Sequence, residues 1–159
     1  MTFASFRVSD GNRGAYRAAV EWSPSWRGIA FAGPSGSGKT HLAAAMVNGL
    51  VGAGICARFA SVPRLLDRMR ADFSRVAHTV EALTAGCDVL ALDDLGAEKS
   101  TDWTNDRLYL IINERVRRCV PIIYTTNYPV VDGGELADRV GSRIVSRILR
   151  TCDVHVVKA

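Results

Sequence analysis

The sequence predicts an α/β fold in which a five-stranded parallel sheet lies between two layers of helices. Five short apolar runs, rich in Val, Ile and Ala, lack the polar alternation of half-exposed strands, which indicates strands buried on both faces. Longer stretches of helical period separate these runs, as the crossovers between parallel strands require. The five predicted strands lie in "GIAFAG", "GICARFAS", "CDVLALDDL", "VPIIYTTN" and "CDVHVVK".

The length of 159 residues corresponds to about one domain. Residues 29–159 carry the alternating strands and helices and are predicted to form that domain. Residues 1–28 contain the turn-rich stretches "SDGNRG" and "SPSWRG" around a short helical stretch, "AYRAAVEW". We expect this segment to be an N-terminal lead-in.

The composition, 48% hydrophobic and 23% charged, is typical of a globular protein and argues against long disorder. No segment approaches the ~20 apolar residues that span a bilayer, and "MTFASFRVSD" lacks the apolar run of a secretion signal. We therefore expect a cytoplasmic protein with no membrane partner. The formal charge of +4 permits a nucleic-acid partner without requiring one.

The four cysteines, Cys56, Cys87, Cys119 and Cys152, are widely spaced and form no C-x-x-C pair. Paired cysteines at short spacing are what a structural zinc site requires. We therefore expect reduced, mostly buried core cysteines and no zinc.

A phosphate-binding loop is predicted at residues 33–40, where "GPSGSGKT" matches G-x-x-x-x-G-K-[ST] between a strand and a helix. The glycines allow successive N–H groups to point around a phosphate at a helix N-terminus. Lys39 is expected to neutralise the β and γ phosphates, and the Thr40 hydroxyl to ligate Mg²⁺. The alternative is a glycine-rich turn with a chance Lys-Thr. The predicted nucleotide contacts are Gly33, Pro34, Ser35, Gly36, Ser37, Gly38, Lys39, Thr40 and His41.

Polar residues follow two more predicted strands. Asp93 and Asp94 end "VLALDD", so one carboxylate is expected near Mg²⁺ and the second beside an attacking water. The run "PIIYTTN" ends in Thr125, Thr126 and Asn127, and a polar side chain there is expected to reach the γ-phosphate or that water, because ligands of such sheets bind where the strands end. The alternatives are solvated acids and a plain turn at "TNYP".

Near the C-terminus, "ELADRVGSRIVSRILR" carries two stripes of a predicted helix, in which Gly141 favours a kink. The apolar stripe, expected to face the sheet, is Leu136, Val140, Ile144 and Ile148. The arginine stripe, expected to face outward, is Arg139, Arg143, Arg147 and Arg150. The simplest role of such a stripe is a solvated face supported by an ion pair between Glu135 and Arg139.

Together, "GPSGSGKTHLAAAMVN", "VLALDDLGAEKSTDW", "RLYLIINER", "IIYTTNY" and "GSRIVSRI" resemble the AAA+ ATPase domain of the DnaC/DnaI-type replicative helicase loaders and their transposon relative, IstB. The resemblance implies a three-layer P-loop NTPase with an AAA+ core and little or no C-terminal lid. It identifies Asp93 with the Walker B residue, Asp94 with the catalytic acid and Asn127 with sensor 1. Arg147 resembles the arginine finger, and Arg143 is the second candidate.

In the resembling loaders, an extra helical element between the second and third strands lines a channel for single-stranded DNA. Here this region carries Arg64 and Arg68 on one predicted helix face and Arg75 further along, and these three are the predicted DNA contacts. The alternative is an amphipathic helix whose arginines are merely solvated. Phe73 is expected in the core rather than stacked on a base.

The function implied is an ATP- and Mg²⁺-dependent helicase loader. It is expected to self-associate through its ATP sites on single-stranded DNA and to help deposit the replicative helicase. One alternative keeps the fold but acts as an IstB-like transposition helper on duplex DNA. Another is a small P-loop phosphotransferase that acts alone on a metabolite.

Overall fold

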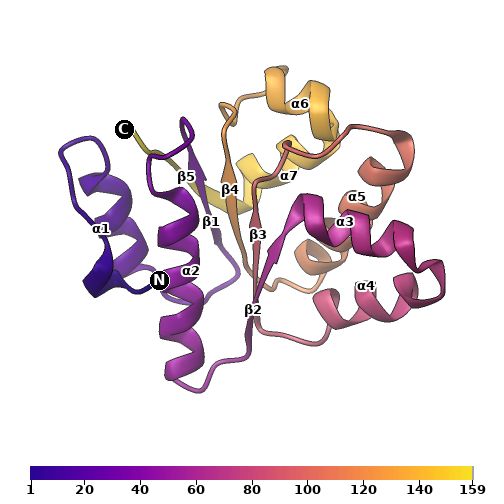
Figure 1. The fold of residues 1–159 in the computed structure, drawn as a ribbon, viewed down its shortest axis with the longest axis horizontal. Helices are drawn as coiled ribbons and strands as arrows, with labels where there is room; N and C mark the ends of the chain where they lie inside the picture. The colour runs from indigo at the N-terminus through magenta and orange to yellow at the C-terminus, as the bar shows by residue number, and fades with distance from the viewer. Residues whose placement is uncertain (159) are drawn as a thin grey trace.

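The computed structural model describes residues 1–158 as three layers around one parallel sheet (Figure 1). The strands are β1 (Gly28–Ala32), β2 (Ala57–Ser61), β3 (Val89–Asp93), β4 (Ile122–Thr126) and β5 (Cys152–Val156). Their order is β2-β3-β4-β1-β5, and every neighbouring pair is parallel. Each strand lies within one of the five predicted runs, so the predicted fold class is confirmed.

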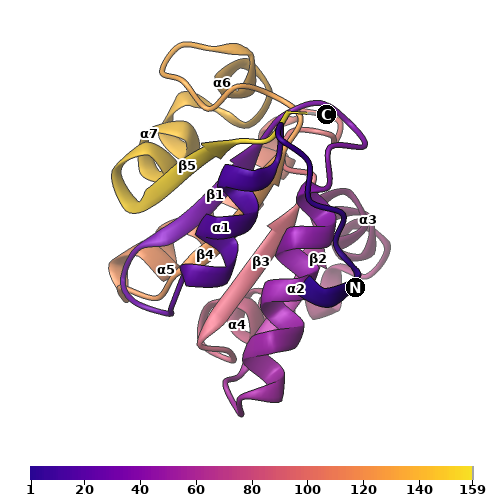
Figure 2. The ribbon, with the colours of Figure 1, turned by 90° about the vertical axis from the view of Figure 1, so that its left-hand side faces the viewer.

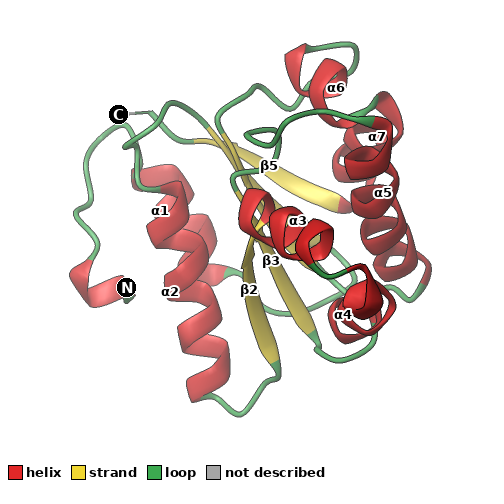
Figure 3. Cartoon of the chain, turned by 45° about the vertical axis from the view of Figure 1, so that its right-hand side comes forward, coloured by secondary structure: helices red, strands yellow, loops and turns green. Residues whose placement is uncertain are grey.

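Helices cover both faces of the sheet (Figure 3). One face carries α1 (Arg13–Glu21) and α2 (Lys39–Gly52). The other carries α3 (Val62–Ala71), α4 (Val76–Thr84), α5 (Asp102–Arg117), α6 (Glu135–Val140) and α7 (Ser142–Thr151). Short 3-10 turns occupy Phe3–Ser5 and Phe73–Arg75. Among the described residues, no helix combines the length and apolar character that crossing a bilayer requires.

The central strands are mostly apolar because each of their faces lies under helices, and their polar residues Asp93, Thr125 and Thr126 come where β3 and β4 end. In β1, Ile29 and Phe31 join the core beneath α1 and α2, whereas Ala30 and Ala32 join the core beneath the opposite helices. All five residues of β1, β3 and β4 are buried. This arrangement explains the lack of polar alternation in their sequences.

The segment before β1 packs against the helix of the phosphate-binding loop. Ala15 and Ala19 of α1 are buried in the same core as Leu42 of α2. At the chain start, Asn48 Nδ2 donates a hydrogen bond of 2.7 Å to the Met1 carbonyl, and Figure 2 shows the N-terminus beside α2. The segment expected as a lead-in therefore contributes a helix to this layer.

Near the C-terminus, the structure has two helices where we predicted one with a kink. Gly141 separates α6 from α7 and has φ +93°, a left-handed conformation that glycine adopts without strain. The predicted kink is therefore a complete break. The apolar stripe is confirmed, because all four of its residues, Leu136, Val140, Ile144 and Ile148, are buried.

The cysteine prediction is half right. All four are free thiols, with Cys87 and Cys152 buried and Cys56 and Cys119 exposed. Cys56 precedes the edge strand β2, and Cys119 lies in the turn after α5 with φ +54°, so neither reaches the core. Burial raises the pKa of the Cys152 thiol to about 12. Within residues 1–158, no group of three or more His, Cys, Asp or Glu residues is placed to hold a metal ion.

A buried arginine joins α4, β3 and β4 on the helix-rich face. Arg115 of α5 is fully buried. Its guanidinium donates hydrogen bonds of 2.9–3.1 Å to the carbonyls of Leu83, Cys87, Asp88 and Pro121. No carboxylate pairs with it among the described residues, so carbonyl dipoles and the Cys87 sulfur, at 3.5 Å, compensate for its charge. Burial accordingly lowers the pKa of Arg115.

We expect Arg115→Leu to lower the free energy of unfolding by about 3–5 kcal/mol, because it leaves four carbonyls without a donor. Urea denaturation followed by circular dichroism measures this loss. Arg117→Ala is the matched control on the same helix, since the Arg117 side chain is 71% exposed. If both variants lost the same small amount of unfolding free energy, the hydrogen bonds from Arg115 to the four carbonyls would contribute little to stability.

Candidate functional site

The phosphate-binding loop lies at the sheet edge where β1, β3 and β4 end (Figure 1). Gly36 and Gly38 have φ +80° and +100°, so the loop needs glycine at both positions. Helix α2 begins at Lys39 with no side-chain cap on its first N–H groups. The loop and the helix N-terminus together form an anion-binding cradle.

The backbone of the phosphate-binding loop holds the Lys39 side chain in place. Its side chain is buried, and its Nζ donates a hydrogen bond of 2.7 Å to the Pro34 carbonyl. Burial lowers the pKa of Lys39, while Asp94 and Asp93 oppose that shift. A phosphate entering the cradle offers Lys39 a charged acceptor in place of a carbonyl, so the residue fits its predicted role.

The two acids after β3 are fixed by β4. Thr125 Oγ1 donates to Asp93 Oδ1 at 2.7 Å and accepts from the backbone N–H of Asp94 at 2.9 Å. Asp94 has φ +58°, an uncommon conformation for a residue with a side chain. Burial and the neighbouring Asp93 raise the pKa of the Asp94 carboxyl, and Lys39 opposes this. The network thus holds the two carboxylates in different environments.

The remaining predicted ATP-site residues lie at the same edge. Thr40 is half-buried in the first turn of α2, and Asn127 is exposed directly after β4. The Gly33 N–H donates to the Thr126 carbonyl at 3.2 Å, which ties the loop to the strand that Asn127 follows. The Thr40 hydroxyl and the Asp93 carboxylate are oxygen donors, the kind that Mg²⁺ takes alongside substrate phosphates.

The N-terminal segment forms a pocket of about 320 Å³ against the loop, which the sequence analysis missed. The Phe6 ring stacks on Tyr16 with 5.5 Å between ring centroids and meets His41 edge-on at 5.3 Å. His41 Nε2 lies 2.9 Å from the Thr2 carbonyl. The pocket is lined by Ser5, Phe6, Arg7, Asn12, Gly36, Ser37, Gly38 and His41. The only sequence features that point to this pocket are the aromatic residues Phe6 and Tyr16 of the N-terminal segment.

The loop after Asp94 is held by a buried acid and by α6. Glu98 Oε2 accepts the Gly96 N–H at 2.9 Å, and Glu98 Oε1 is buried without a partner. Arg139 donates to the Gly96 carbonyl at 3.2 Å and lies over the Tyr128 ring. The predicted ion pair between Arg139 and Glu135 is also present, at 3.6 Å.

Burial raises the pKa of Glu98 above its ordinary value of 4.5. The folded state therefore holds the Glu98 proton more tightly than the unfolded state, and stability is lost as pH rises through the folded pKa. We expect Glu98→Gln to be more stable than the wild type near neutral pH, because the amide oxygen still accepts from Gly96. The difference in stability between the variant and the wild type should shrink towards pH 4.5. Thermal melts of both proteins between neutral pH and pH 4.5 measure this difference, and a difference that does not change with pH would contradict the prediction.

The outward orientation predicted for the arginine stripe holds for Arg143 and Arg150 but is wrong for Arg147 and Arg139, which are half-buried. Arg147 lies over the Tyr109 ring at 4.5 Å. Its guanidinium donates to Asn113 Oδ1 at 2.6 and 3.0 Å and to the Tyr109 hydroxyl at 2.7 Å. Tyr109 and Asn113 lie four residues apart on α5, so they present one surface to Arg147.

The three predicted DNA contacts do not share one surface. Arg64 and Arg68 of α3 face a groove beside β2, whereas Arg75 follows α3 and pairs with Asp72 at 3.2 Å. Phe73, expected in the core, is instead 68% exposed, because the helical period of α3 ends at Ala71 and a 3-10 turn follows.

Phe73 belongs to an aromatic cluster on the other side of α3. Its ring meets Trp103 of α5 nearly edge-on, with 6.0 Å between ring centroids. The Arg70 guanidinium lies 5.4 Å from the Trp103 ring centre. We call Arg70, Phe73 and Trp103 the aromatic platform. The sequence analysis named neither Arg70 nor Trp103 as part of a shared site.

Comparisons with known proteins give a family match over nearly the whole chain. The family described as IstB-like ATP binding protein matches residues 6–159. An ATP-binding protein in an insertion sequence of Mycobacterium tuberculosis is 34% identical over 116 residues, 69% of this chain and 44% of that protein. YqaM of Bacillus subtilis is 28% identical over 163 residues, 91% of this chain and 51% of that protein. The chain thus spans about half the length of these curated relatives.

Two solved structures share the fold. The crystal structure of the DnaC helicase loader has a TM-score of 0.84 at 26% identity and covers 99% of this chain and 96% of that one. The replication initiator DnaA, bound to AMPPCP and single-stranded DNA, has a TM-score of 0.82 at 24% identity. It covers 99% of this chain and 50% of that one, and at this identity the likeness concerns the fold alone.

Proposed function

Because the chain belongs to the IstB-like ATP-binding family, we propose that it is an AAA+ ATPase module that assembles on single-stranded DNA and helps to load a replicative helicase. The observation that carries this proposal is the match to the DnaC helicase loader, which extends over 96% of that chain. A single-stranded partner is proposed because the exposed Phe73 ring and the neighbouring Trp103 ring offer a surface on which unpaired bases can stack. The chemistry proposed is ATP hydrolysis at the edge of the sheet.

In this proposal, the cradle at residues 33–40 binds the phosphates of ATP. Lys39 exchanges the Pro34 carbonyl for phosphate oxygens, while Thr40 and Asp93 hold Mg²⁺. The metal, when bound, neutralises charge on the β and γ oxygens. Asp94, anchored through Thr125, accepts a hydrogen bond from the attacking water, and Asn127 orients that water.

The base of ATP is proposed to enter the pocket that Phe6 and His41 form beside the loop. Its volume of about 320 Å³ lies directly against Gly36–Gly38, where the phosphates bind. The Phe6 ring offers an aromatic surface for a planar base. In this proposal, the N-terminal segment forms part of the nucleotide site.

Hydrolysis is proposed to need a neighbouring subunit that contributes an arginine from α7. Arg147 is the first candidate, and in the single chain it is held by Asn113 and Tyr109. It must leave these partners to reach another subunit. Arg143, the second candidate, is exposed and lies 5.9 Å from the centre of the Tyr109 ring, so it is held less tightly than Arg147. Either guanidinium stabilises charge that develops on the γ-phosphate.

The aromatic platform is the proposed contact with DNA bases. An exposed Phe73, a Trp103 ring and a guanidinium that lies over that ring form the kind of surface on which unpaired bases stack. Arg75, two residues beyond Phe73, is proposed to contact phosphate. Arg64 and Arg68, which were predicted as phosphate contacts, face the other side of α3 and are not part of this proposed DNA site.

We expect Phe73→Ala to weaken binding of a single-stranded oligothymidylate by roughly 5- to 150-fold, since stacking contributes ~1–3 kcal/mol per base. Fluorescence anisotropy at fixed salt measures this change, and quenching of Trp103 fluorescence should accompany binding to the wild type. Val8→Ala is the control, because it removes an exposed apolar side chain far from α3 in the sequence. Unchanged affinity in Phe73→Ala would remove the platform from the DNA site.

The relative in an insertion sequence favours a second candidate function, that of a transposition helper on duplex DNA. Anisotropy with single-stranded and duplex DNA of equal length, at matched salt, separates the two. The ATPase assignment itself is tested by measuring hydrolysis per molecule over a wide protein concentration range, with and without DNA. A rise with concentration supports assembly, whereas a constant value points to a self-contained phosphotransferase.

A further inference from the structure

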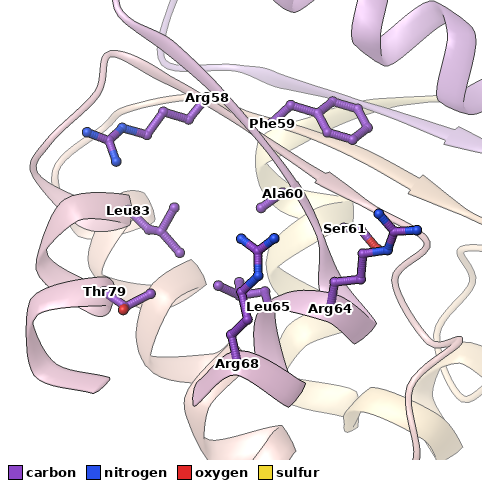
Figure 4. A pocket seen from close by; sticks show the side chains of 9 residues that line it. All are labelled: Arg58, Phe59, Ala60, Ser61, Arg64, Leu65, Arg68, Thr79 and Leu83. Carbon is purple, nitrogen blue, oxygen red and sulfur yellow. The ribbon is translucent and has the colours of Figure 1, made fainter. Parts of the chain in front are cut away.

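A groove of about 560 Å³ opens along the outer edge of the sheet, between β2 and helices α3 and α4 (Figure 4). Arg58 of β2 and Arg64 and Arg68 of α3 line it together. Leu65 and Leu83 provide apolar surface between them. The groove lies on the opposite side of α3 from the aromatic platform and takes no part in the ATP site.

All the charged side chains that line the groove are positive. No carboxylate lines it, and none of its three arginines forms an ion pair or a side-chain hydrogen bond among the described residues. Figure 4 shows Arg64 and Arg68 extending from α3 towards β2. Elsewhere, Arg27 and Arg75 are paired with Asp153 and Asp72. Three unpaired guanidiniums around an open volume select an anionic occupant.

The backbone of β2 forms one wall. Successive side chains of a strand point to opposite faces, so a groove lined by all of residues 58–61 runs along the edge of the strand itself. Strand β2 pairs with β3 on one side and, within the described residues, with nothing on the other. Its outer edge therefore presents alternating N–H donors and C=O acceptors.

The pattern of donors and acceptors on this edge decides between two anionic occupants, an acidic peptide and the backbone of DNA. An extended peptide carries alternating donors and acceptors that match a strand edge, and its side chains can contact Leu65 and Leu83. The sugar-phosphate backbone of DNA offers acceptors but no donors, so it leaves the β2 carbonyls unpaired. The groove consequently fits a peptide better than the nucleic acid for which Arg64 and Arg68 were predicted.

We propose that this groove binds an extended, acidic segment of a partner protein, which adds as a strand to the outer edge of β2. The partner's carboxylates pair with Arg58, Arg64 and Arg68, and its backbone pairs with residues 58–61. This site goes beyond the proposed ATP and DNA sites. When empty, the same arginines keep two β2 edges from pairing with each other, as charged residues do on other edge strands.

The test is an NMR titration of the ¹⁵N-labelled chain with the peptide acetyl-Glu-Val-Glu-Val-Glu-amide, up to about 1 mM, a range that detects weak contacts. We expect the amide signals of residues 58–61 to shift and their hydrogen exchange to slow. Arg58→Ala should weaken binding at least fivefold. Arg150→Ala, which removes an exposed arginine on α7, should leave binding unchanged.

Two further peptides make the result decisive. N-methylation of alternate peptide nitrogens should abolish binding, because it removes the donors that pair with β2, and replacement of Glu by Lys should do the same. No binding of the Glu peptide, or equal binding of the methylated one, would overturn the proposal. The proposal would also be overturned if oligothymidylate shifted the same amide signals and Arg58→Ala weakened its binding, since the groove would then be a phosphate site. Loss of DNA binding in Phe73→Ala tests the platform separately.

Discussion

Arg147→Ala is expected to lower ATP hydrolysis per molecule by about 10³-fold or more at concentrations where the wild type assembles, the scale of an arginine finger. ATP binding should persist, because Arg147 lies on α7 and contacts α5 rather than the phosphate-binding loop. Hydrolysis of radiolabelled ATP gives the rate, and equilibrium dialysis gives the affinity. A comparable rate in the variant and the wild type would assign the role to Arg143 or to no arginine of α7.

The contacts of Arg147 within its own chain require a specific control. Its removal also leaves Asn113 and Tyr109 without their partner, so a loss of activity has a structural explanation as well. The double variant Tyr109→Phe/Asn113→Ala removes the same side-chain hydrogen bonds but keeps the guanidinium. We expect this variant to retain activity, because Arg147 is released rather than lost. Equal losses in the two variants would show that Arg147 only fastens α7 to α5.

Lys39→Met is expected to abolish measurable ATP binding and ATP-dependent assembly while leaving the fold at least as stable as in the wild type. The loss follows from removing the charge that meets the β and γ phosphates. Stability should not fall, because burial disfavours the charged lysine, as its lowered pKa indicates, and methionine fills a similar volume. Dialysis with ATP and thermal melting without it measure the two effects.

A variant that binds ATP like the wild type would contradict the assignment of the loop. A variant that melts much earlier would mean that the hydrogen bond from Lys39 to Pro34 stabilises the empty loop. Lys158→Met is a suitable control, because Lys158 is an exposed lysine near the other end of the chain.

The features that the sequence predicted well depend on neighbours along the chain. The strands follow from short apolar runs, and the turn from β1 into α2, with positive φ at Gly36 and Gly38, follows from a run of eight consecutive residues. The apolar stripe on α6 and α7 follows from a four-residue spacing that survives the break at Gly141. Each of these patterns has a single structural solution once the helices and strands pack as layers.

The features that the sequence analysis missed depend on contacts between distant segments. Thr125 fixes Asp93 and Asp94 only because β3 and β4 are neighbours in the sheet. Phe6 reaches Gly38 only because the N-terminal segment folds back onto α2. No local pattern specifies either contact.

The arginines between β2 and β3 were grouped incorrectly because their neighbours in space also come from distant segments. Spacing placed Arg64 and Arg68 on one face, and the structure agrees, but spacing gave no sign that Arg58 of β2 faces them. It also gave no sign that Arg70 lies against Trp103, thirty-three residues further along the chain. The half-buried position of Arg147 was missed because Tyr109 and Asn113 come from another helix.

The central claim is that one ATP site is completed by two subunits, and mixing two inactive variants tests it most directly. Lys39→Ala keeps the arginine but lacks the site, whereas Arg147→Ala keeps the site but lacks the arginine. Each alone should hydrolyse ATP at a small fraction of the wild-type rate. Mixed in equal amounts with single-stranded DNA, they should recover activity well above the sum of the two. A mixture no more active than that sum, although the two variants associate, would contradict the claim.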